Sequence, residues 1–339
     1  MSVTIKDVAK RAGVAVSTVS KLINGGNVLE PKRTEILNAI EELDYKVNPL
    51  ARGMKTKKTR TIGVMIPNLS DYYGVSILTY VSQFMYKENY STIVCDYHFN
   101  DDNSTNAKEK LDFLLDYQVD GIIMQPIECK PSDFARIRKE KIPLVFVDIQ
   151  DNENYSDSVV IDNESITYEV IRHLMDNGHK RIALITGGSG IVTTDDRVAG
   201  YIRALQEGGM PFRPEYVFKE SINEESGYAG MKSFMELKEP PTAVFAAGHD
   251  LMAGSLRYVA DSKLKIPDDI SFVGFENSEL ARIYNPKLTI GIQPMEKIAK
   301  TASDMLLERM SGTYLGVARK RKVDTIIEYG DSVKNISKS

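Results

Sequence analysis

The sequence predicts two folds in one chain: a small all-α helix-turn-helix domain at the N-terminus, then an α/β core of two doubly wound parallel-sheet lobes. Two observations support this division. Residues 4–43 contain short amphipathic helical segments joined by glycine, whereas the chain from Thr61 onward alternates short apolar runs with helical patterns. The length of 339 residues also exceeds what one hydrophobic core usually spans.

Three helices are expected in the N-terminal domain. Thr4 and Asp7 form a capping-box arrangement at the start of the first helix, and Gly13 supplies the sharp turn that follows it. The second helix is expected over residues 16–24, and Pro31 suits the first position of the third. The residues expected to face the core are Ile5, Val8, Ala9, Ala12, Val19, Leu22, Ile23, Ile36, Leu37, Ile40 and Leu43.

Charge is distributed unevenly along the chain. Residues 1–60 hold 12 Lys and Arg against 6 Asp and Glu, whereas the remainder holds 31 against 41. The basic end is therefore the expected nucleic-acid-binding end. A basic run closes it, made of Arg52, Lys55, Lys57, Lys58 and Arg60. A solvated linker would have the same composition, so the run alone does not decide between the two.

The outward face of the second helix favours DNA binding. It presents short polar residues that can contact phosphates, together with side chains that can reach base edges. An ordinary solvent-facing helix would also be polar, but this one follows a glycine turn in the basic part of the chain. The residues of this face are Val16, Ser17, Thr18, Ser20, Lys21 and Asn24.

Several motifs in order resemble the lac repressor (LacI/GalR) family of transcriptional regulators. The N-terminal ones are Asp7-Val8-Ala9, Ala12-Gly13-Val14, Thr18-Val19-Ser20, Asn24, Arg33 and Asn48-Pro49-Leu50-Ala51-Arg52. The later ones are Val119-Asp120-Gly121-Ile122-Ile123, Gly178-His179-Lys180-Arg181-Ile182-Ala183, Asp196-Arg197-Val198-Ala199-Gly200-Tyr201 and Gly274-Phe275-Glu276-Asn277. The resemblance runs from about Val3 to about Gly330.

The resemblance implies a docking mode in which the second helix enters the major groove of operator DNA. By it, the base-reading side chains are those of Val16, Ser17 and Lys21. The phosphate-contacting residues are Thr18, Ser20, Asn24 and Arg33. One departure stands out, because Ala15 occupies the place where the family usually has a serine that caps this helix. A missing cap costs about 1 kcal/mol of local helix stability.

Residues 48–54 can start a short helix, since Asn48 is a good N-cap and Pro49 a good first residue. Gly53 and the short length make that helix marginal in isolation. In the family this segment is the hinge helix, which binds the minor groove beside its dimer mate. The resemblance gives this role to Leu50, Ala51, Met54 and Lys55. Met54 would be the wedge between base steps, where leucine is typical.

The core is expected to contain parallel strands. The predicted strands are residues 61–66, 91–95, 121–124, 144–147, 158–161, 182–186, 243–246 and 271–275. The resemblance implies a periplasmic-binding-protein-like arrangement, with an N-lobe of about 61–160 and 292–323 and a C-lobe of about 161–291 and 324–330. It also places a helix-turn-helix domain at 1–47, a hinge and linker at 48–60 and a polar tail at 331–339.

Ligands of such folds bind at the carboxyl ends of the strands, in the cleft between lobes. The polar residues that follow the predicted strands are therefore expected to bind an effector: Tyr72, Tyr73, Asp148, Arg197, His249 and Glu276. This set suits a polyhydroxylated ligand such as a sugar or sugar derivative. Ile222 stands where the family often has an aromatic platform, and Glu276 stands where aspartate is common, so the effector need not be a simple hexose. Asp250 is expected to cap the helix that follows it.

Nothing in the sequence predicts an enzyme, a metal site or a cofactor. Cys95 and Cys129 lack metal-ligand or redox spacing, and Gly187-Gly188-Ser189-Gly190 lacks the lysine of a P-loop. The N-terminus has no signal-peptide pattern and no long apolar run predicts a membrane span, so a cytoplasmic protein is expected.

The expected function is that of a homodimeric repressor of a pseudo-palindromic operator, controlled by a small-molecule effector. Control by a protein co-regulator is the alternative within this class. A cytoplasmic ligand-binding protein or an enzyme on the same core is the alternative outside it, but neither explains residues 1–58.

Overall fold

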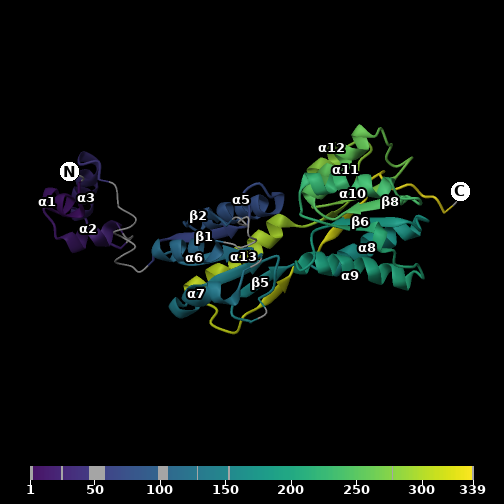
Figure 1. Cartoon of the computed structure of the whole chain (residues 1–339). Helices are drawn as coiled ribbons and strands as arrows, with labels where there is room; N and C mark the ends of the chain where they lie inside the picture. The colour runs from purple at the N-terminus through teal and green to yellow at the C-terminus, as the bar shows by residue number, and fades with distance from the viewer. Residues whose placement is uncertain are drawn as a thin grey trace. The chain divides into compact units, whose positions relative to one another are not determined.

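The computed structural model describes residues 3–23, 26–45, 58–97, 106–127, 129–151, 153–276 and 278–337. It divides into two compact units, Met1–Arg60 and Thr61–Ser339, and each is described by itself (Figure 1). The predicted fold class is confirmed: the first unit is helical, and the second holds two sheets with parallel strands covered by helices.

The first unit contains the helices α1 (Ile5–Arg11), α2 (Val16–Ile23) and α3 (Lys32–Glu42). Val8, Val19 and Ile36 are fully buried and form the centre of its small core. Gly13 has φ +64°, a left-handed conformation that glycine adopts without strain, and this allows the turn between α1 and α2.

Two expectations about α3 were wrong. Pro31 lies directly before the helix, at its N-cap, and not at its first position. Leu37 is 47% exposed, because α3 buries Ile36 and Ala39 and successive helical residues are about 100° apart around the axis.

The predicted capping box at the start of α1 is present. The Asp7 carboxylate accepts hydrogen bonds from the backbone N–H of Thr4 at 2.8 Å and from its hydroxyl at 2.7 Å. We expect Thr4→Ala to lower the opening free energy of α1 by about 1 kcal/mol, which means about fivefold faster amide exchange in this helix. Hydrogen exchange of the full chain measures this, with the exposed Lys6→Ala on the same helix as the matched control; equal exchange in both variants would contradict the role of the cap.

The second unit contains two six-stranded sheets. The sheet of the N-lobe has the order β11-β5-β4-β3-β1-β2, and that of the C-lobe has the order β12-β10-β9-β8-β6-β7. Each pair of neighbours is parallel except β10 with β12, which is antiparallel. The strands are β1 (Thr61–Ile66), β2 (Ser91–Asp96), β3 (Gly121–Met124), β4 (Leu144–Val147), β5 (Asp157–Val160), β6 (Ile182–Thr186), β7 (Val217–Lys219), β8 (Ala243–Ala246), β9 (Ser271–Phe275), β10 (Thr289–Ile292), β11 (Lys320–Lys322) and β12 (Ile326–Glu328).

Helices alternate with these strands along the chain. The helices of the N-lobe are α5 (Tyr72–Lys87), α6 (Ala107–Asp116), η1 (Pro131–Phe134), α7 (Ala135–Glu140) and α13 (Met295–Ser311). The helices of the C-lobe are α8 (Asn163–Asp176), α9 (Val192–Glu207), η2 (Pro214–Tyr216), α10 (Glu224–Met235), α11 (His249–Asp261) and α12 (Ser278–Ile283). Figure 1 shows the yellow-green α13 among the blue elements of the N-lobe, although it comes late in the sequence.

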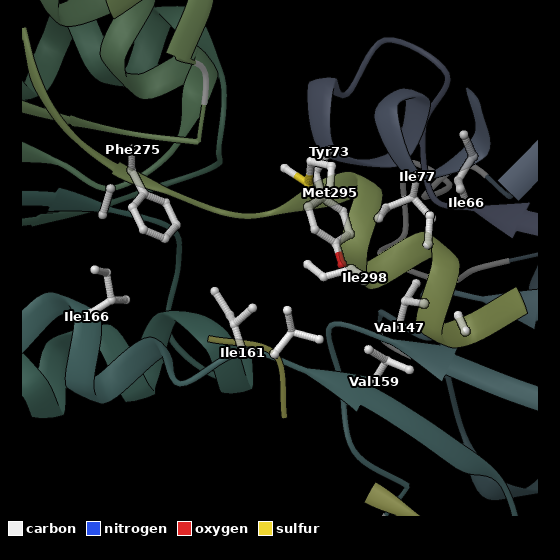
Figure 2. Close-up of a cluster of buried hydrophobic side chains, with 14 of the residues drawn as sticks. Ile66, Tyr73, Ile77, Val147, Val159, Ile161, Ile166, Phe275, Met295 and Ile298 are labelled. Carbon is white, nitrogen blue, oxygen red and sulfur yellow. The ribbon is translucent and has the colours of Figure 1, made fainter. Parts of the chain in front are cut away.

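The chain crosses between the lobes three times: from β5 to α8, from β10 to α13, and from β11 to β12. One hydrophobic core cluster includes residues of both lobes beside these crossings (Figure 2). Tyr73 of α5 and Met295 of α13 belong to it together with Ile166 of α8 and Phe275 of β9. The cluster therefore connects the packing of the two lobes around the segments that join them.

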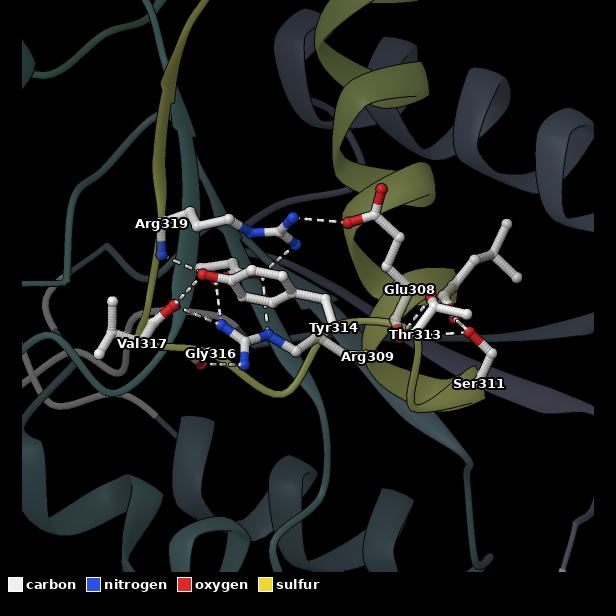
Figure 3. A network of polar contacts seen from close by, with 10 residues as sticks. Glu308, Arg309, Ser311, Thr313, Tyr314, Gly316, Val317 and Arg319 are labelled. Atoms are coloured by element: carbon white, nitrogen blue, oxygen red, sulfur yellow. Dashed lines mark hydrogen bonds and ion pairs between the residues drawn. The ribbon is translucent and has the colours of Figure 1, made fainter.

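A polar network ties the late segment 308–319 into the N-lobe (Figure 3). The side chain of Asp157 in β5 is fully buried and accepts hydrogen bonds from the guanidinium groups of Arg309 and Arg319. The centre of the Tyr314 ring lies 4.5 Å from Cζ of Arg309 and 3.7 Å from Cζ of Arg319. This network holds β11 against β5 at the edge of the sheet.

Candidate functional site

The first candidate site is the outward face of α2. Val19 turns inward and is fully buried, which leaves Val16 41% exposed. Ser17 and Lys21 are also exposed, whereas Thr18 and Ser20 are partly buried. The structure therefore gives solvent access to the three side chains predicted to read bases: Val16 and Ser17 are adjacent in the first turn of α2, and Lys21 follows Ser17 by about one turn.

The helix α2 forms without a side-chain cap at Ala15. The backbone carbonyl of Ala15 accepts hydrogen bonds from the N–H groups of Thr18 at 2.9 Å and Val19 at 3.3 Å. Arg33, on α3, is exposed and lies 3.8 Å from the Glu30 carboxylate. The remaining predicted DNA contacts, Asn24, Leu50, Ala51, Met54 and Lys55, lie outside the described residues.

The second candidate site is a cavity of about 600 Å³ between the two lobes of the core. Its walls come from segments that directly follow the carboxyl ends of β1, β3 and β4 in the N-lobe and of β6, β7, β8 and β9 in the C-lobe. This is the position in which doubly wound folds bind ligands. The lining residues are Pro67, Asn68, Asp71, Tyr73, Gln125, Ile127, Asp148, Ile191, Thr193, Arg197, Ser221, Ile222, Asn223, Gly248, His249, Asp250 and Glu276.

Of the six residues predicted to bind an effector, five line this cavity: Tyr73, Asp148, Arg197, His249 and Glu276. Tyr72 does not, because it is the first residue of α5 and turns toward two neighbouring pockets. Its ring stacks on the imidazole of His249 with 4.5 Å between the ring centroids. Tyr72 therefore packs against His249 of the cavity wall but does not line the cavity itself.

Arg197 is held rigidly in the cavity wall. Gly200 lets α9 approach α8 closely, since a Cβ there would lie 2.2 Å from the backbone oxygen of Glu164. The Arg197 guanidinium then reaches across, with Nε donating to Asn163 Oδ1 at 2.9 Å and Nη1 donating to the Ala247 carbonyl at 2.7 Å. It also lies 4.6 Å from the centre of the Phe275 ring. Its geometry is therefore fixed before any ligand binds.

Glu276 is the central carboxylate of the C-lobe wall. One of its oxygens accepts a hydrogen bond from the backbone N–H of His249 at 3.0 Å, and the other accepts one from Gln293 Nε2 at 2.9 Å. Burial raises its pKa to about 7, against the lowering effect of Arg197, whose Nη2 lies 4.0 Å away. Glu276 thus accepts the hydrogen bond of the first N–H of α11. The expectation that Asp250 caps this helix was wrong, because the N-cap position is Gly248 and Asp250 makes no capping hydrogen bond.

The N-lobe wall contains buried polar atoms without a partner among the described residues. Gln125 Nε2 donates to Asp148 Oδ2 at 3.3 Å, which leaves Gln125 Oε1 and Asp148 Oδ1 without a hydrogen bond. The Tyr73 hydroxyl is also without one. Burial raises the pKa of Asp148. Burial also raises the pKa of the Tyr73 hydroxyl, and the nearby Asp148 carboxylate raises it further. Burying a polar atom without a hydrogen-bond partner is costly. These atoms therefore indicate a surface where a bound ligand can supply the missing partners.

The backbone is strained at both carboxylates. Asp148 has φ +70° and Glu276 has φ +78°, and each directly follows its strand. Such conformations cost about 1–3 kcal/mol for residues with a side chain and concentrate at ligand-binding positions. The two strained residues face the cavity from opposite lobes.

Sequence reasoning missed Asp71, Gln125 and Asn223 in the cavity wall. Gln125 directly follows β3, so the rule that found Asp148 would also have found it. Asp71 and Asn223 are N-caps, accepting from Gly74 N and Ser226 N, both at 2.8 Å, and this local role conceals their position in the cavity. Burial and the Asp250 carboxylate raise the pKa of Asp71, although its hydrogen bond from Gly74 lowers it.

Within the described residues, no cluster of three or more His, Cys, Asp or Glu side chains is arranged to hold a metal ion. Over the same part of the chain, every helix is too short or too polar to span a bilayer.

Comparisons with known proteins match both units. Residues 4–48 match the model of the bacterial regulatory proteins of the lacI family, and residues 171–333 match that of a periplasmic binding protein-like domain. Catabolite control protein A of Priestia megaterium is 33% identical over 313 residues, which is 92% of this chain and 93% of that protein. The HTH-type transcriptional repressor PurR of Aliivibrio salmonicida is 30% identical over 309 residues, or 91% and 92% of the two chains.

A crystal structure of the lac repressor dimer, bound to operator and the anti-inducer ONPF, covers 98% of this chain and 100% of its own, with a TM-score of 0.86 and 24% sequence identity. The fold agrees with these matches. The chain belongs to the lacI family of bacterial regulatory proteins, DNA-binding transcription regulators that join a helix-turn-helix domain to an effector-binding core.

Proposed function

We propose that this regulator is a repressor whose α2 reads operator bases through Val16, Ser17 and Lys21. The observation that carries this assignment is the burial of Val19, which leaves these three side chains accessible on one face. Lys21 can donate to guanine O6 or N7, and Val16 can contact a thymine methyl group. The phosphate contacts proposed with them are Thr18, Ser20, Asn24 and Arg33.

We further propose that two protomers bind a pseudo-palindromic site, with recognition helices in successive major grooves. Leu50, Ala51, Met54 and Lys55 form the hinge contacts of this proposal. Its domain division is 1–47 for the helix-turn-helix, 48–60 for the hinge and 61–330 for the core. A role on DNA also favours a cytoplasmic location and no enzymatic activity.

The proposed effector site is the interlobe cavity. Two of its lining residues are hydrogen bonded to segments of the chain that cross between the lobes. Arg197 is hydrogen bonded to Asn163, the first residue of α8 after the first crossing. Glu276 is bonded to Gln293, which lies in the second. At the third, Lys322 pairs with Asp162 of the first crossing at 2.5 Å, a contact between crossings that lies outside the cavity lining. A ligand that changes the bonding of Arg197 or Glu276 therefore shifts the balance between lobe arrangements, which is the physical requirement for allosteric control.

The test of base reading uses Lys21→Ala in the full-length protein. An operator is first selected from random duplex DNA by the parent protein, and each of its positions is then varied. We expect Lys21→Ala to bind the selected operator more weakly by a factor of about a hundred or more and to lose preference at one base pair in each half-site, because a good base contact is worth about 1–3 kcal/mol and each of the two protomers loses one. Fluorescence anisotropy measures both quantities.

The matched control is Lys58→Ala, a lysine outside α2. We expect it to weaken binding to all sequences alike and to reduce the number of counterions released on binding by about two, one for each protomer of the dimer. An unchanged base preference in Lys21→Ala would refute the base-reading assignment, and failure of the parent to select any sequence would refute sequence-specific binding itself.

A further inference from the structure

We infer that the interlobe cavity takes a polyhydroxylated ligand bearing a protonated amine, with the amine bound against Asp148 and the carboxylates beside it. The inference rests on the proposed function, because it names the chemical class of the effector for the same cavity. The proposed ligand differs from a neutral sugar, which the cavity could recognise through hydroxyl groups alone.

The first argument is the charge of the cavity wall. Four carboxylic acids line it, those of Asp71, Asp148, Asp250 and Glu276, against one guanidinium, that of Arg197. Among the described residues no lysine lines it, and burial lowers the pKa of the lining His249, which favours the neutral imidazole. A wall with this excess of acids favours a ligand that brings a positive charge.

The second argument is that Arg197 cannot neutralise all of these carboxylates. Two of its nitrogens are bonded to Asn163 and the Ala247 carbonyl, and a third lies 4.0 Å from Glu276. Burial raises the pKa of Asp148 and of Glu276, and Arg197 lowers both. The neighbouring carboxylates raise them further, Asp71 acting on Asp148, and Asp71 and Asp148 on Glu276. These carboxylates are thus close enough to repel, and a cation among them relieves that repulsion.

The third argument is the kind of polar atom left without a partner. Gln125 and Tyr73 are each 4% exposed, and the unbonded atoms at this wall are Gln125 Oε1, Asp148 Oδ1 and the Tyr73 hydroxyl. Two of these can only accept a hydrogen bond, and the hydroxyl can accept or donate. An ammonium group offers three donors in a compact space, and its bond to a carboxylate is about twice as strong as a neutral one.

The fourth argument is the weakness of the apolar platform. The cavity volume of about 600 Å³ fits a small ligand, yet Ile222, Ile127 and Ile191 supply its main apolar surface. In the described part of the lining, Tyr73 is the one phenol ring. With little aromatic surface for a sugar face to stack on, stacking contributes less here, which increases the importance of charge and hydrogen bonding for selecting the ligand.

The experiment measures thermal stability and calorimetric binding of the full-length protein at neutral pH. The probes are glucosamine, galactosamine and mannosamine, each compared with its N-acetyl derivative and with its neutral parent hexose. We expect at least one amine to raise Tm and to bind about tenfold or more tightly than both of its neutral counterparts, because a charge-assisted hydrogen bond to a buried group is lost in those.

The diagnostic variant is Asp148→Asn, since asparagine tolerates the positive φ at this position and keeps the shape of the side chain. We expect it to lose the preference for the amine over its neutral counterparts, whereas the exposed Asp304→Asn on α13 keeps it. The inference is overturned if no amine shifts Tm, if a neutral counterpart binds as tightly as its amine, or if Asp148→Asn retains the preference. Operator binding, followed on the same protein by anisotropy, reports on the proposed function separately.

Discussion

Replacing Arg197 by methionine is expected to lower the free energy of unfolding by about 3–5 kcal/mol. The guanidinium is 4% exposed, and its removal leaves Asn163 Oδ1 and the Ala247 carbonyl without their donors. It also removes the one arginine or lysine among the described residues that line the cavity, so the carboxylates beside it lose their compensating charge. Removing one partner of a buried ion pair typically has a cost of this size.

The control for this variant is Arg203→Met on the same helix. Arg203 pairs with Glu164, but both side chains are about two-fifths exposed, so water screens the pair. We expect a loss below about 1 kcal/mol for this variant. Urea unfolding followed by circular dichroism measures both changes. Similar losses for Arg197→Met and Arg203→Met would show that the buried guanidinium is not specially important to the cavity.

The same substitution changes the pH dependence of stability through Glu276. Its folded pKa of about 7 lies above the reference value of 4.5, so the folded state binds more protons than the unfolded state between these values. Stability from this group therefore falls as pH rises from about 4.5 to about 7. Arg197 lowers this pKa, so we expect its loss to extend the fall above pH 7.

The strands of the core could be predicted from sequence because buried parallel strands are continuous apolar runs. Gly121–Met124 and Leu144–Val147, for example, are fully buried and contain no charged residue. The strand β11, Lys320–Lys322, carries only basic residues and is exposed, so no local pattern indicates it. It pairs with β5, more than 150 residues earlier in the chain, and the contacts of Asp157 hold it there.

Cavity residues could be predicted from sequence where a charged side chain directly follows a predicted strand. Asp148 and Glu276 are charged and directly follow strands, which is sufficient to select them. Arg197 is a turn inside α9, and its place in the wall depends on the close approach of two helices at Gly200. For Tyr72 and Tyr73 position alone could not decide, because adjacent residues at a helix start point in different directions, and only Tyr73 faces the cavity.

Replacing Asp157 by alanine is expected to lower the free energy of unfolding by about 3–5 kcal/mol. The carboxylate is fully buried and receives bonds from Arg309 at 2.7 and 3.1 Å, from Arg319 Nη2 at 2.9 Å and from the Arg319 backbone N–H at 2.8 Å. Without it, two guanidinium groups that are 20% and 16% exposed face each other across the Tyr314 ring (Figure 3). Arg309 then loses its carboxylate partner and Arg319 keeps only the exposed Glu308, so two like charges in a largely enclosed site are poorly compensated, which is strongly destabilising.

The matched control is Glu308→Ala, which removes the other carboxylate bonded to Arg319. Glu308 is 46% exposed, so we expect a loss of less than about 1 kcal/mol. Hydrogen exchange should locate the damage of Asp157→Ala first in β11 and in the loop before it, because these segments depend on the network for their attachment. Uniform loss of protection across the N-lobe would instead indicate that the network supports the whole sheet.

The pH dependence distinguishes loss of this ion pair from loss of packing. Burial raises the pKa of Asp157, but the hydrogen bonds from Arg309 and Arg319 lower it overall, so the folded value lies below the ordinary aspartate value of 3.8. The stabilisation by the carboxylate is then fully present above about pH 4 and is lost as pH falls through the folded pKa. The stability difference between the parent and Asp157→Ala should therefore be constant near neutral pH and shrink in acid. A difference that persists unchanged to low pH would mean that the side chain acts by filling space, and that β11 is held by its backbone pairing alone.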